Sequence, residues 1–518
     1  MHIGHNINLP RDRSLEILRV TDPRHDKARI EEKTGGLLDT TCQWVLENAE
    51  FLNWRRDMQN KLLWIRGDPG KGKTMLLCSI INDLERTGGL VSYFFCQAAD
   101  ERINNAVAAL RGLIYMLVQL QPTLISHVRK HCEHTSGQVF TDTNAWIIAR
   151  NIFVDILRDP ALKVSYLVID AVDECLTGRT ELLDLIVSEA SDTKVKWIVS
   201  SRNWPDVEEK LVGAEQVTLS LELNSQSVSA AVELFIEEKT KNLAKLKGYD
   251  AKTTAQVAEY MASNAGDTFL WVAIVYRNLE KINRFKVLRT LHSFPAGLDQ
   301  LYKRMMEQIR EEGDQDDVDL CMQILSVAST VYRPITLDEL GSFLECPCDI
   351  QQSSGWLEHY IKLCGSFLAI RSRSVFFVHQ SAKDYLCQPA NKLFPFGEHE
   401  MHYTIFSQCI RVMSGTLSRN LYGLSSPGYS LEDVKVPDPD PLGVMRYACI
   451  YWVDHLCTWG STSTGIDKTD LQDGGILDVF LRKHYLHWLE ALSLLQRMTK
   501  GLVSVSRLES LLQVMPSF

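Results

Sequence analysis

The sequence has no apolar run near the length that crosses a membrane. A spanning helix needs roughly 18 apolar residues, and the longest runs, around Phe269 to Tyr276 and Gly112 to Val118, are far shorter. The segment from Met1 to Val20 mixes His, Asn, Arg and Asp, and it lacks the charged-then-apolar order of a secretory signal. We therefore expect a cytoplasmic protein without a membrane span.

Paired cysteines and an excess of basic charge are also absent. The 13 cysteines are scattered mostly singly, which suits reduced thiols better than a disulfide framework. The net charge is −10, so the chain as a whole creates no field that attracts nucleic acid or anionic lipid. We expect no direct contact with nucleic acid.

The composition, with 45% apolar and 23% charged residues, is typical of a folded protein, and the length suggests about three or four domains. Runs typical of strands occur at 61–67, 90–96, 164–170, 195–201 and 216–221, and helical spacing occurs between them, for example at 74–86, 105–120 and 146–157. This alternation predicts a largely parallel α/β sheet.

Beyond Asn224 the pattern changes to helices alone. Helical spacing is found at 228–243, 253–264 and 269–282, and after an acidic stretch the order helix, helix, strand is found at 321–332, 337–344 and 374–378. The first group predicts a helical domain and the second fits a small winged-helix unit. A connector rich in Pro, Gly and Asp leads to further helices from 445 to 512.

One segment carries a complete phosphate-binding motif, because the residues between a predicted strand and a predicted helix satisfy G-x-x-x-x-G-K-[ST]. They are Gly67, Asp68, Pro69, Gly70, Lys71, Gly72, Lys73 and Thr74. The glycines let backbone N–H groups surround phosphate oxygens at a helix N-terminus. We expect Lys73 to bridge the terminal phosphates and Thr74 to bind Mg²⁺; the alternative is a chance glycine-rich turn.

A second acidic motif follows at the end of a predicted central strand. The apolar run from Tyr166 ends in Asp170, whose carboxylate would hold Mg²⁺ through its water shell. Just beyond it, Asp173 and Glu174 could orient or deprotonate the attacking water. The alternative for this pair is a solvated acidic turn.

The next predicted strand, at 196–199, leads into Ser200, Ser201 and Arg202. This order places polar groups at the carboxyl edge of the sheet, where ligands of α/β proteins bind. Arg202 could therefore sense the γ-phosphate. The alternative is that it pairs with a nearby carboxylate such as Asp206.

Together, the glycine-rich loop, YLVIDAVDE at 166–174 and KWIVSSR at 196–202 resemble the NACHT branch of the STAND signalling ATPases. Fungal NACHT proteins of the vegetative-incompatibility type are the most similar. The likeness spans nearly the whole chain, because matching segments follow in order at 22–26, 34–38, 294–302, 333–337, 377–386 and 485–492.

The resemblance implies a nucleotide-dependent switch that hydrolyses slowly, holds ADP or GDP at rest, and forms a homo-oligomer with ATP or GTP. Protein partners and a role in self/non-self recognition or programmed cell death are also implied. In that family a winged-helix histidine contacts the β-phosphate of the diphosphate, a role that falls on His379; from the residues alone, His379 is more typical of a core histidine. The effector domain and repeats usual in the family are not evident.

The predicted fold class is an α/β P-loop NTPase with an ASCE-type parallel sheet, followed by a helical domain, a winged helix and a helical C-terminal region. The ranges we expect are a lead segment at 1–45, a nucleotide-binding domain at 46–222, and later domains at 223–302, 303–390 and 391–518. Two other functions stay open: a P-loop enzyme with steady turnover, and a scaffold that binds nucleotide without hydrolysis.

Other groups carry weaker signals. We interpret His127, His131, Cys132 and His134 as an exposed helix end rather than a metal site, and Cys346-Pro347-Cys348 as a turn with incidental thiols. No metal beyond Mg²⁺ is predicted. Cys175 and Ser200 lack a neighbouring base in the sequence, so covalent catalysis is not expected.

Overall fold

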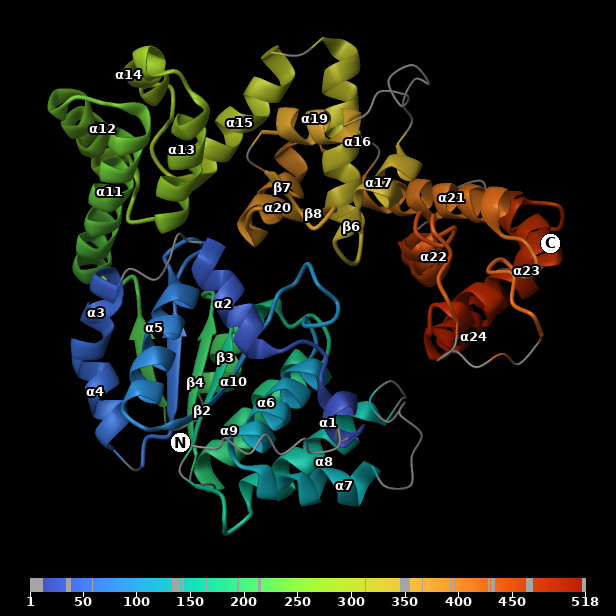
Figure 1. Cartoon of the computed structure of the whole chain (residues 1–518), viewed down its shortest axis with the longest axis horizontal. Coiled ribbons are helices and arrows are strands. Elements are labelled where there is room, and N and C mark those ends of the chain that lie inside the picture. The colour runs from blue at the N-terminus through green and yellow to red at the C-terminus, as the bar shows by residue number, and fades with distance from the viewer. Residues whose placement is uncertain are drawn as a thin grey trace, which may run out of the picture. The chain divides into compact units, whose positions relative to one another are not determined.

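The computed structural model describes residues 13–33, 39–57, 59–132, 140, 144–163, 165–192, 195–212, 216–312, 314–344, 355–365, 367–391, 393–395, 397–426, 429, 434–462 and 469–514. The chain divides into two compact units, Met1–Arg304 and Met305–Phe518 (Figure 1). Within the described ranges, no helix combines the length and apolar character needed to span a bilayer.

A five-stranded parallel sheet forms the centre of the first unit (Figure 1). Its order is β2-β3-β4-β1-β5, and the strands are β1 (Leu62–Arg66), β2 (Leu90–Phe95), β3 (Ser165–Asp170), β4 (Lys196–Ser201) and β5 (Gln216–Ser220). The predicted parallel α/β sheet is therefore confirmed. Because β4 lies between β1 and β3, the ends of the three strands that carry the predicted site residues lie side by side.

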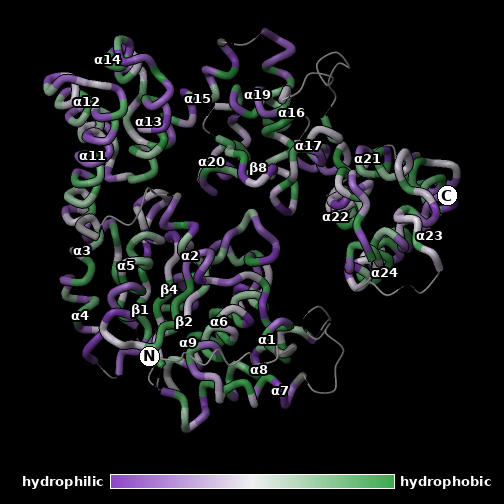
Figure 2. Tube along the Cα trace, in the orientation of Figure 1, coloured by the Kyte–Doolittle hydropathy of each residue, from purple (hydrophilic) through white to green (hydrophobic). Residues whose placement is uncertain are grey.

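Helices connect the strands of the sheet, as the crossovers between parallel strands require. They are α5 (Lys73–Arg86), α6 (Ala106–Leu120), α7 (Ile125–Cys132), α8 (Ala145–Leu157), α9 (Arg179–Asp192) and α10 (Pro205–Val212), with a 3₁₀ turn η1 (Pro122–Leu124). Helix α6 is mostly hydrophobic (Figure 2) and buries most of its residues. It lies so close to β2 that a Cβ at Gly112 would be 2.4 Å from the ring of Phe94.

In the described residues before the sheet there are four helices: α1 (Arg13–Leu18), α2 (Pro23–Lys33), α3 (Asp39–Glu47) and α4 (Ala49–Arg56). The predicted lead segment at 1–45 thus includes helices that pack on the first unit. The Arg111 guanidinium of α6 donates to the carbonyl of Ile17 at 2.6 Å, and Lys27 of α2 donates to the side chain of Asn82 in α5 at 2.6 Å.

Lys196 ties the end of α4 to the sheet. Its side chain is buried, and its ammonium donates to the carbonyls of Trp54, Arg55 and Asp57, the last at 2.6 Å. These are carbonyls at the C-terminus of a helix, which have no partner within the helix itself. A cation there also interacts favourably with the helix dipole.

We expect Lys196→Met to destabilise the first unit by about 3 kcal/mol, because the apolar stem is kept while buried carbonyls lose their donor. The measurement is the shift of the unfolding transition of the first unit in thermal and urea unfolding. Lys241→Met is the matched control, since Lys241 forms a single exposed pair with Glu237 and should change stability by less than about 0.5 kcal/mol. Equal effects of the two substitutions would contradict the role given to Lys196.

A helical group completes the first unit, with α11 (Ser225–Lys247), α12 (Ala251–Asn264), α13 (Phe269–Lys281), η3 (Arg284–Lys286) and α14 (Val287–Leu291). The three helices predicted at 228–243, 253–264 and 269–282 are confirmed. Helix α11 ends at Gly248, which has φ 68°, and Asp250 then caps α12 by accepting the N–H of Thr253 at 2.6 Å. Helix α15 (Leu298–Glu312) runs across the boundary between the units.

The second unit begins with helices around a small antiparallel sheet of order β6-β8-β7. Its elements are α16 (Gln315–Thr330), β6 (Ile335–Thr336), α17 (Leu337–Phe343), α19 (Trp356–Leu363), β7 (Leu368–Arg371), β8 (Ser374–Phe377), α20 (Gln380–Leu386) and η4 (Pro389–Asn391). A capping box between Thr336 and Glu339 begins α17. The helices and strand expected here are present, and their assignment as a winged helix stays a prediction.

The rest of the second unit is helical, as predicted. It comprises α21 (Glu398–Thr416), α22 (Arg446–Thr462), η5 (Thr469–Leu471), α23 (Ile476–Leu494) and α24 (Met498–Val514). Aromatic residues form much of its core: the ring of Trp452 lies 5.4 Å from Trp488 and 5.6 Å from Phe480.

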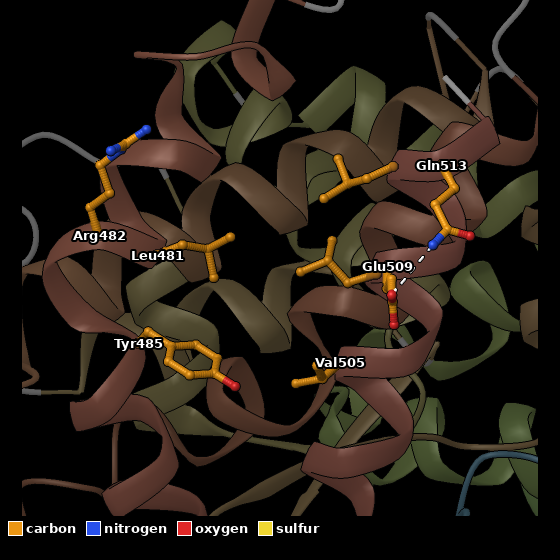
Figure 3. A pocket seen from close by; sticks show the side chains of 8 residues that line it. Leu481, Arg482, Tyr485, Val505, Glu509 and Gln513 are labelled. Atoms are coloured by element: carbon orange, nitrogen blue, oxygen red, sulfur yellow. Dashed lines mark hydrogen bonds between the residues drawn. The ribbon is translucent and has the colours of Figure 1, made fainter. Parts of the chain in front are cut away.

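An apolar groove of about 630 Å³ lies between α23 and α24 (Figure 3). It is lined by Leu481, Arg482, Tyr485, Val505, Leu508, Glu509, Leu512 and Gln513. Glu509 accepts a hydrogen bond from Gln513 at 3.3 Å on one wall (Figure 3). None of the predicted site residues contributes to this groove.

Candidate nucleotide-binding site

The glycine-rich loop connects β1 to α5 at the carboxyl edge of the sheet. Gly70 and Gly72 have φ angles of 79° and 87°, which only glycine adopts without strain. A Cβ at Gly72 would also lie 2.9 Å from the ring of Phe269. Gly72 precedes α5 and provides no side-chain cap, so the first N–H groups of the helix are left for another acceptor.

Lys73 lies inside this loop. Its ammonium donates to the carbonyls of Gly67 and Asp68, the second at 3.0 Å, and its side chain is half-buried. Burial lowers the pKa of Lys73, while the carboxylates of Asp173 and Asp170 act in the opposite direction. The loop therefore holds a cation that faces the acidic end of β3.

The start of α13 covers one side of the loop. The N–H of Leu270 donates to the carbonyl of Gly70 at 3.4 Å, and a Cβ at Gly70 would be only 2.7 Å from the methyl group of Thr268. The Lys71 ammonium donates to the carbonyl of Gly266 at 3.4 Å and lies 4.0 Å from Asp267. The helical group of the first unit thus packs directly against the loop.

The opposite end of the loop is held by the segments that follow β4 and β5. The N–H of Asp68 donates to Glu222 at 2.8 Å, and the Asn203 side chain donates to the Asp68 carboxylate at 3.1 Å. Burial favours the protonated form of Glu222, but hydrogen bonds, first that from Asp68, keep its pKa below the ordinary value. Pro69 has no backbone N–H, so its nitrogen needs no acceptor in this turn.

Asp170 ends β3 and is 3% exposed. Its carboxylate accepts the hydroxyl of Ser200 at 2.5 Å, and the Thr74 hydroxyl lies near enough to lower its pKa. Burial raises the pKa of Asp170, although the two hydroxyl donors and the nearby ammonium oppose this. The two residues predicted to hold Mg²⁺, Thr74 and Asp170, are therefore close together.

Their oxygen atoms suit a hard cation such as Mg²⁺, which binds few protein ligands and keeps several waters. In the described part of the chain, no three His, Cys, Asp or Glu side chains form a metal-binding group. A Mg²⁺ ion held by Thr74 and Asp170 would take its remaining ligands from water and phosphate.

A strained acidic turn follows Asp170. Ala171 has φ 52° and ψ 52°, a left-handed conformation that is uncommon for residues other than glycine. Its N–H donates to the hydroxyl of Ser200 at 2.8 Å, and its carbonyl accepts the N–H of Glu174 at 2.8 Å within the 3₁₀ turn η2 (Val172–Glu174). We refer to residues 171–174 as the acidic turn.

Arg202 pairs with this turn. Its Nε lies 3.2 Å from Oδ2 of Asp173, its backbone N–H donates to Oδ1 at 3.2 Å, and one Nη lies 4.0 Å from Glu174. The alternative we kept for Arg202 was a pairing with a nearby carboxylate such as Asp206. Arg202 does pair with carboxylates, but they are Asp173 and Glu174, whereas Asp206 pairs with Arg179. Asp173, Glu174 and Arg202 are brought together.

The two acidic side chains are not a solvated surface pair. Burial raises the pKa of Asp173 above its ordinary value, with Arg202 opposing. Burial also raises the pKa of Glu174 to about 7, although its Oε2 accepts the N–H of Ala98 at 3.0 Å. A carboxyl group that titrates near neutrality can both accept and return a proton.

His379 lies in the second unit, immediately before α20. Its Nδ1 accepts the backbone N–H of Ser381 at 3.1 Å and lies 2.8 Å from the Ser381 hydroxyl. The ring therefore caps the helix. Its contact with a diphosphate stays a prediction.

The remaining candidate groups have structural partners. His127 lies 2.7 Å from Asp159 and His131 lies 3.2 Å from Asp155. Cys175 is buried, and the Ser200 hydroxyl donates a hydrogen bond to the carboxylate of Asp170. The Cys132 side chain, His134, the segment at 34–38 and the turn at 346–348 lie outside the described residues.

Three polar side chains that bind main-chain or side-chain groups of the site were not predicted: Glu222, Asn203 and Arg179. Glu222 and Asn203 contact Asp68, which is distant from them in sequence, and Arg179 donates to a main-chain carbonyl of the acidic turn. No local motif therefore marks these residues. The one signal near Arg179 in the sequence is the glycine before it, Gly178, a residue type that often precedes a helix.

The sheet, with a glycine-rich loop between β1 and α5, fits the α/β P-loop class. Residues 40–202 match the family model described as Nephrocystin 3, N-terminal. The chain is 50% identical over 520 residues to the vegetative incompatibility protein HET-E-1 of Podospora anserina, an alignment that covers 97% of this chain and 38% of that protein. The resemblance to fungal NACHT proteins of the vegetative-incompatibility type is confirmed. The chain spans well under half the length of this relative.

Proposed function

We propose that the chain is a nucleotide-dependent signalling switch that binds ATP or GTP with Mg²⁺ and hydrolyses it slowly. The observation that carries this proposal is that Lys73, held by carbonyls of the loop, lies close to Thr74 and Asp170 beside a helix N-terminus that no side chain caps. Loop N–H groups bind the phosphates, and Lys73 neutralises the terminal ones. Thr74 and Asp170 hold the Mg²⁺.

Hydrolysis falls to the acidic turn. Glu174, with a pKa of about 7, accepts a proton from the attacking water, and Asp173 orients that water. Arg202 now neutralises these carboxylates, and a γ-phosphate would attract it. Turnover is slow because the carboxylates become available only when Arg202 moves.

The switch requires that the two nucleotides bind the two conformations with different free energies, since equal binding shifts no equilibrium. Diphosphate, held by the loop and by His379 of a winged helix, stabilises the resting form. Triphosphate replaces that contact with one to Arg202, and the opened chain forms homo-oligomers. The name of HET-E-1 supports a place in fungal self/non-self recognition or programmed cell death, with protein partners.

We expect triphosphate, and not diphosphate, to increase the oligomer size. The nucleotide that copurifies with the protein is identified first. The oligomer size is then measured by light scattering after size-exclusion chromatography with ADP, GDP and non-hydrolysable analogues of ATP and GTP. His379→Ala should favour assembly with diphosphate, whereas a matched His379→Asn variant keeps an acceptor that caps α20 and separates the cap from the phosphate contact. No change of size with any nucleotide, combined with normal binding, would favour the scaffold; steady multiple turnover would favour the enzyme.

A further inference from the structure

Besides the N–H of Ala98, which donates to Glu174 at 3.0 Å, the acidic turn is anchored by the side chains of three residues in the described structure. Ser200 accepts the N–H of Ala171 at 2.8 Å, and Arg202 binds the Asp173 carboxylate through its backbone and its guanidinium. The third anchor is Arg179, whose Nη1 donates to the main-chain carbonyl of Asp173 at 3.0 Å. Only this third anchor holds Asp173 without occupying its carboxylate.

Arg179 is itself fixed in place. It is the first residue of α9, its Nη2 donates to Asp206 in the first turn of α10 at 2.5 Å, and its guanidinium carbon lies 5.0 Å from the ring centre of Trp204. The side chain is 23% exposed, against 53% for Asp206. A planar guanidinium can serve a carbonyl, a carboxylate and an aromatic face at once, which an ammonium cannot.

We propose that Arg179 is a positioning residue that holds the main chain of the acidic turn while Arg202 is engaged elsewhere. This inference rests on the proposed function. If Arg202 turns to a γ-phosphate, Asp173 loses its guanidinium partner, and the strained conformation of Ala171 gives the turn no stability of its own. Arg179 then keeps the main chain of the turn in place, and it occupies none of the carboxylate oxygens of Asp173 and Glu174.

A purely structural role would be to tie α9 to α10. Lys210 and Asp184 form such a tie, at 2.7 Å between the same two helices. Lys210 touches no residue of the acidic turn in the interactions described. Lys210→Gln therefore removes an ion pair of the same layer and is the matched control for Arg179→Gln.

The test compares wild type, Arg179→Gln, Arg179→Lys and Lys210→Gln in two measurements. In the first, hydrolysis of Mg²⁺-ATP and Mg²⁺-GTP, Arg179→Gln should lower kcat about tenfold and change KM less than about twofold, because misplacement costs chemistry rather than binding. Arg179→Lys should be intermediate, since one of the two acceptors is regained. Lys210→Gln should match wild type.

The second measurement is amide hydrogen exchange without added nucleotide. Peptides that cover the acidic turn should exchange about tenfold faster in Arg179→Gln, which is the effect of one lost hydrogen bond. Their exchange rate should not change in Lys210→Gln. The inference is overturned if Arg179→Gln matches Lys210→Gln in exchange, or if its kcat equals that of an active wild type. A wild type without turnover would instead defeat the proposed hydrolysis, and the exchange measurement would still decide whether Arg179 holds the turn.

Discussion

Replacing Lys73 with alanine is expected to weaken the binding of Mg²⁺-triphosphate at least about 100-fold, because a hydrogen bond from a charged donor contributes about 1.5–3 kcal/mol and Lys73 would make more than one. The ammonium now donates to the carbonyls of Gly67 and Asp68 and lies near two buried carboxylates. Phosphate oxygens would replace those carbonyls at little cost in geometry. Calorimetry with ATP, GTP, ADP and GDP measures the loss.

Lys71 provides the matched control, because it lies in the same loop but is directed at Gly266 and Asp267 of the helical group. Lys71→Ala should weaken binding by no more than about fivefold, because its pair with Asp267 is long, at 4.0 Å, and only partly buried. Circular dichroism and thermal unfolding show whether each variant keeps its fold. Tight binding by a folded Lys73→Ala protein would remove the loop from the proposed site.

The central strands β1, β3 and β4 were predictable because each carries a short apolar run that ends at a polar residue, whereas β2 ends at Phe95 and the edge strand β5, QVTLS, alternates. The run predicted at 90–96 is β2 (Leu90–Phe95), and the run at 195–201 is β4 (Lys196–Ser201). Strands buried on both faces need apolar residues at every position, so they are visible without a periodic pattern. The long helices α6 and α13 were visible for a similar reason.

Elements stabilised by polar contacts were not predictable from apolar spacing. Helix α2, PRHDKARIEEK, has few apolar residues, and it is held by Asp22 at its start and by Lys27, which donates to Asn82 at 2.6 Å. The two-residue strand β6 exists only through its pairing with β8. Such contacts link segments far apart in the chain, and the sequence does not record them locally.

The same division applies to the candidate site. Gly67–Thr74 and Asp170 belong to local motifs, and phosphate and Mg²⁺ binding require these residue types at these positions. The partner of Arg202 was left open, because a lone arginine with acidic residues on both sides in sequence has several possible partners. The cover of the loop by Thr268 and Phe269 depends on how the helical group packs, which no motif specifies.

Glu174→Gln is expected to abolish most hydrolysis and at the same time to stabilise the protein without nucleotide. Removal of a general base costs about 10²- to 10⁴-fold in rate. Burial raises the pKa of Glu174 from 4.5 to about 7, so the favourable contribution of this group is complete below pH 4.5 and is lost as the pH rises through 7. At pH 8 the ionised side chain therefore costs up to about 3 kcal/mol, which the neutral amide avoids.

Two pH series test this expectation. The wild-type kcat should rise as the pH increases through about 7 and then level off, as the base loses its proton, and unfolding transitions should shift to higher temperature in Glu174→Gln at pH 8 but little at pH 5. Glu181→Gln, at an exposed position of α9, is the control and should leave both series unchanged. If Glu174→Gln is less stable than wild type at pH 8, the ionised Glu174 side chain does not destabilise the protein. If Glu174→Gln keeps wild-type turnover, another group accepts the proton from water, with Asp173 the nearest candidate.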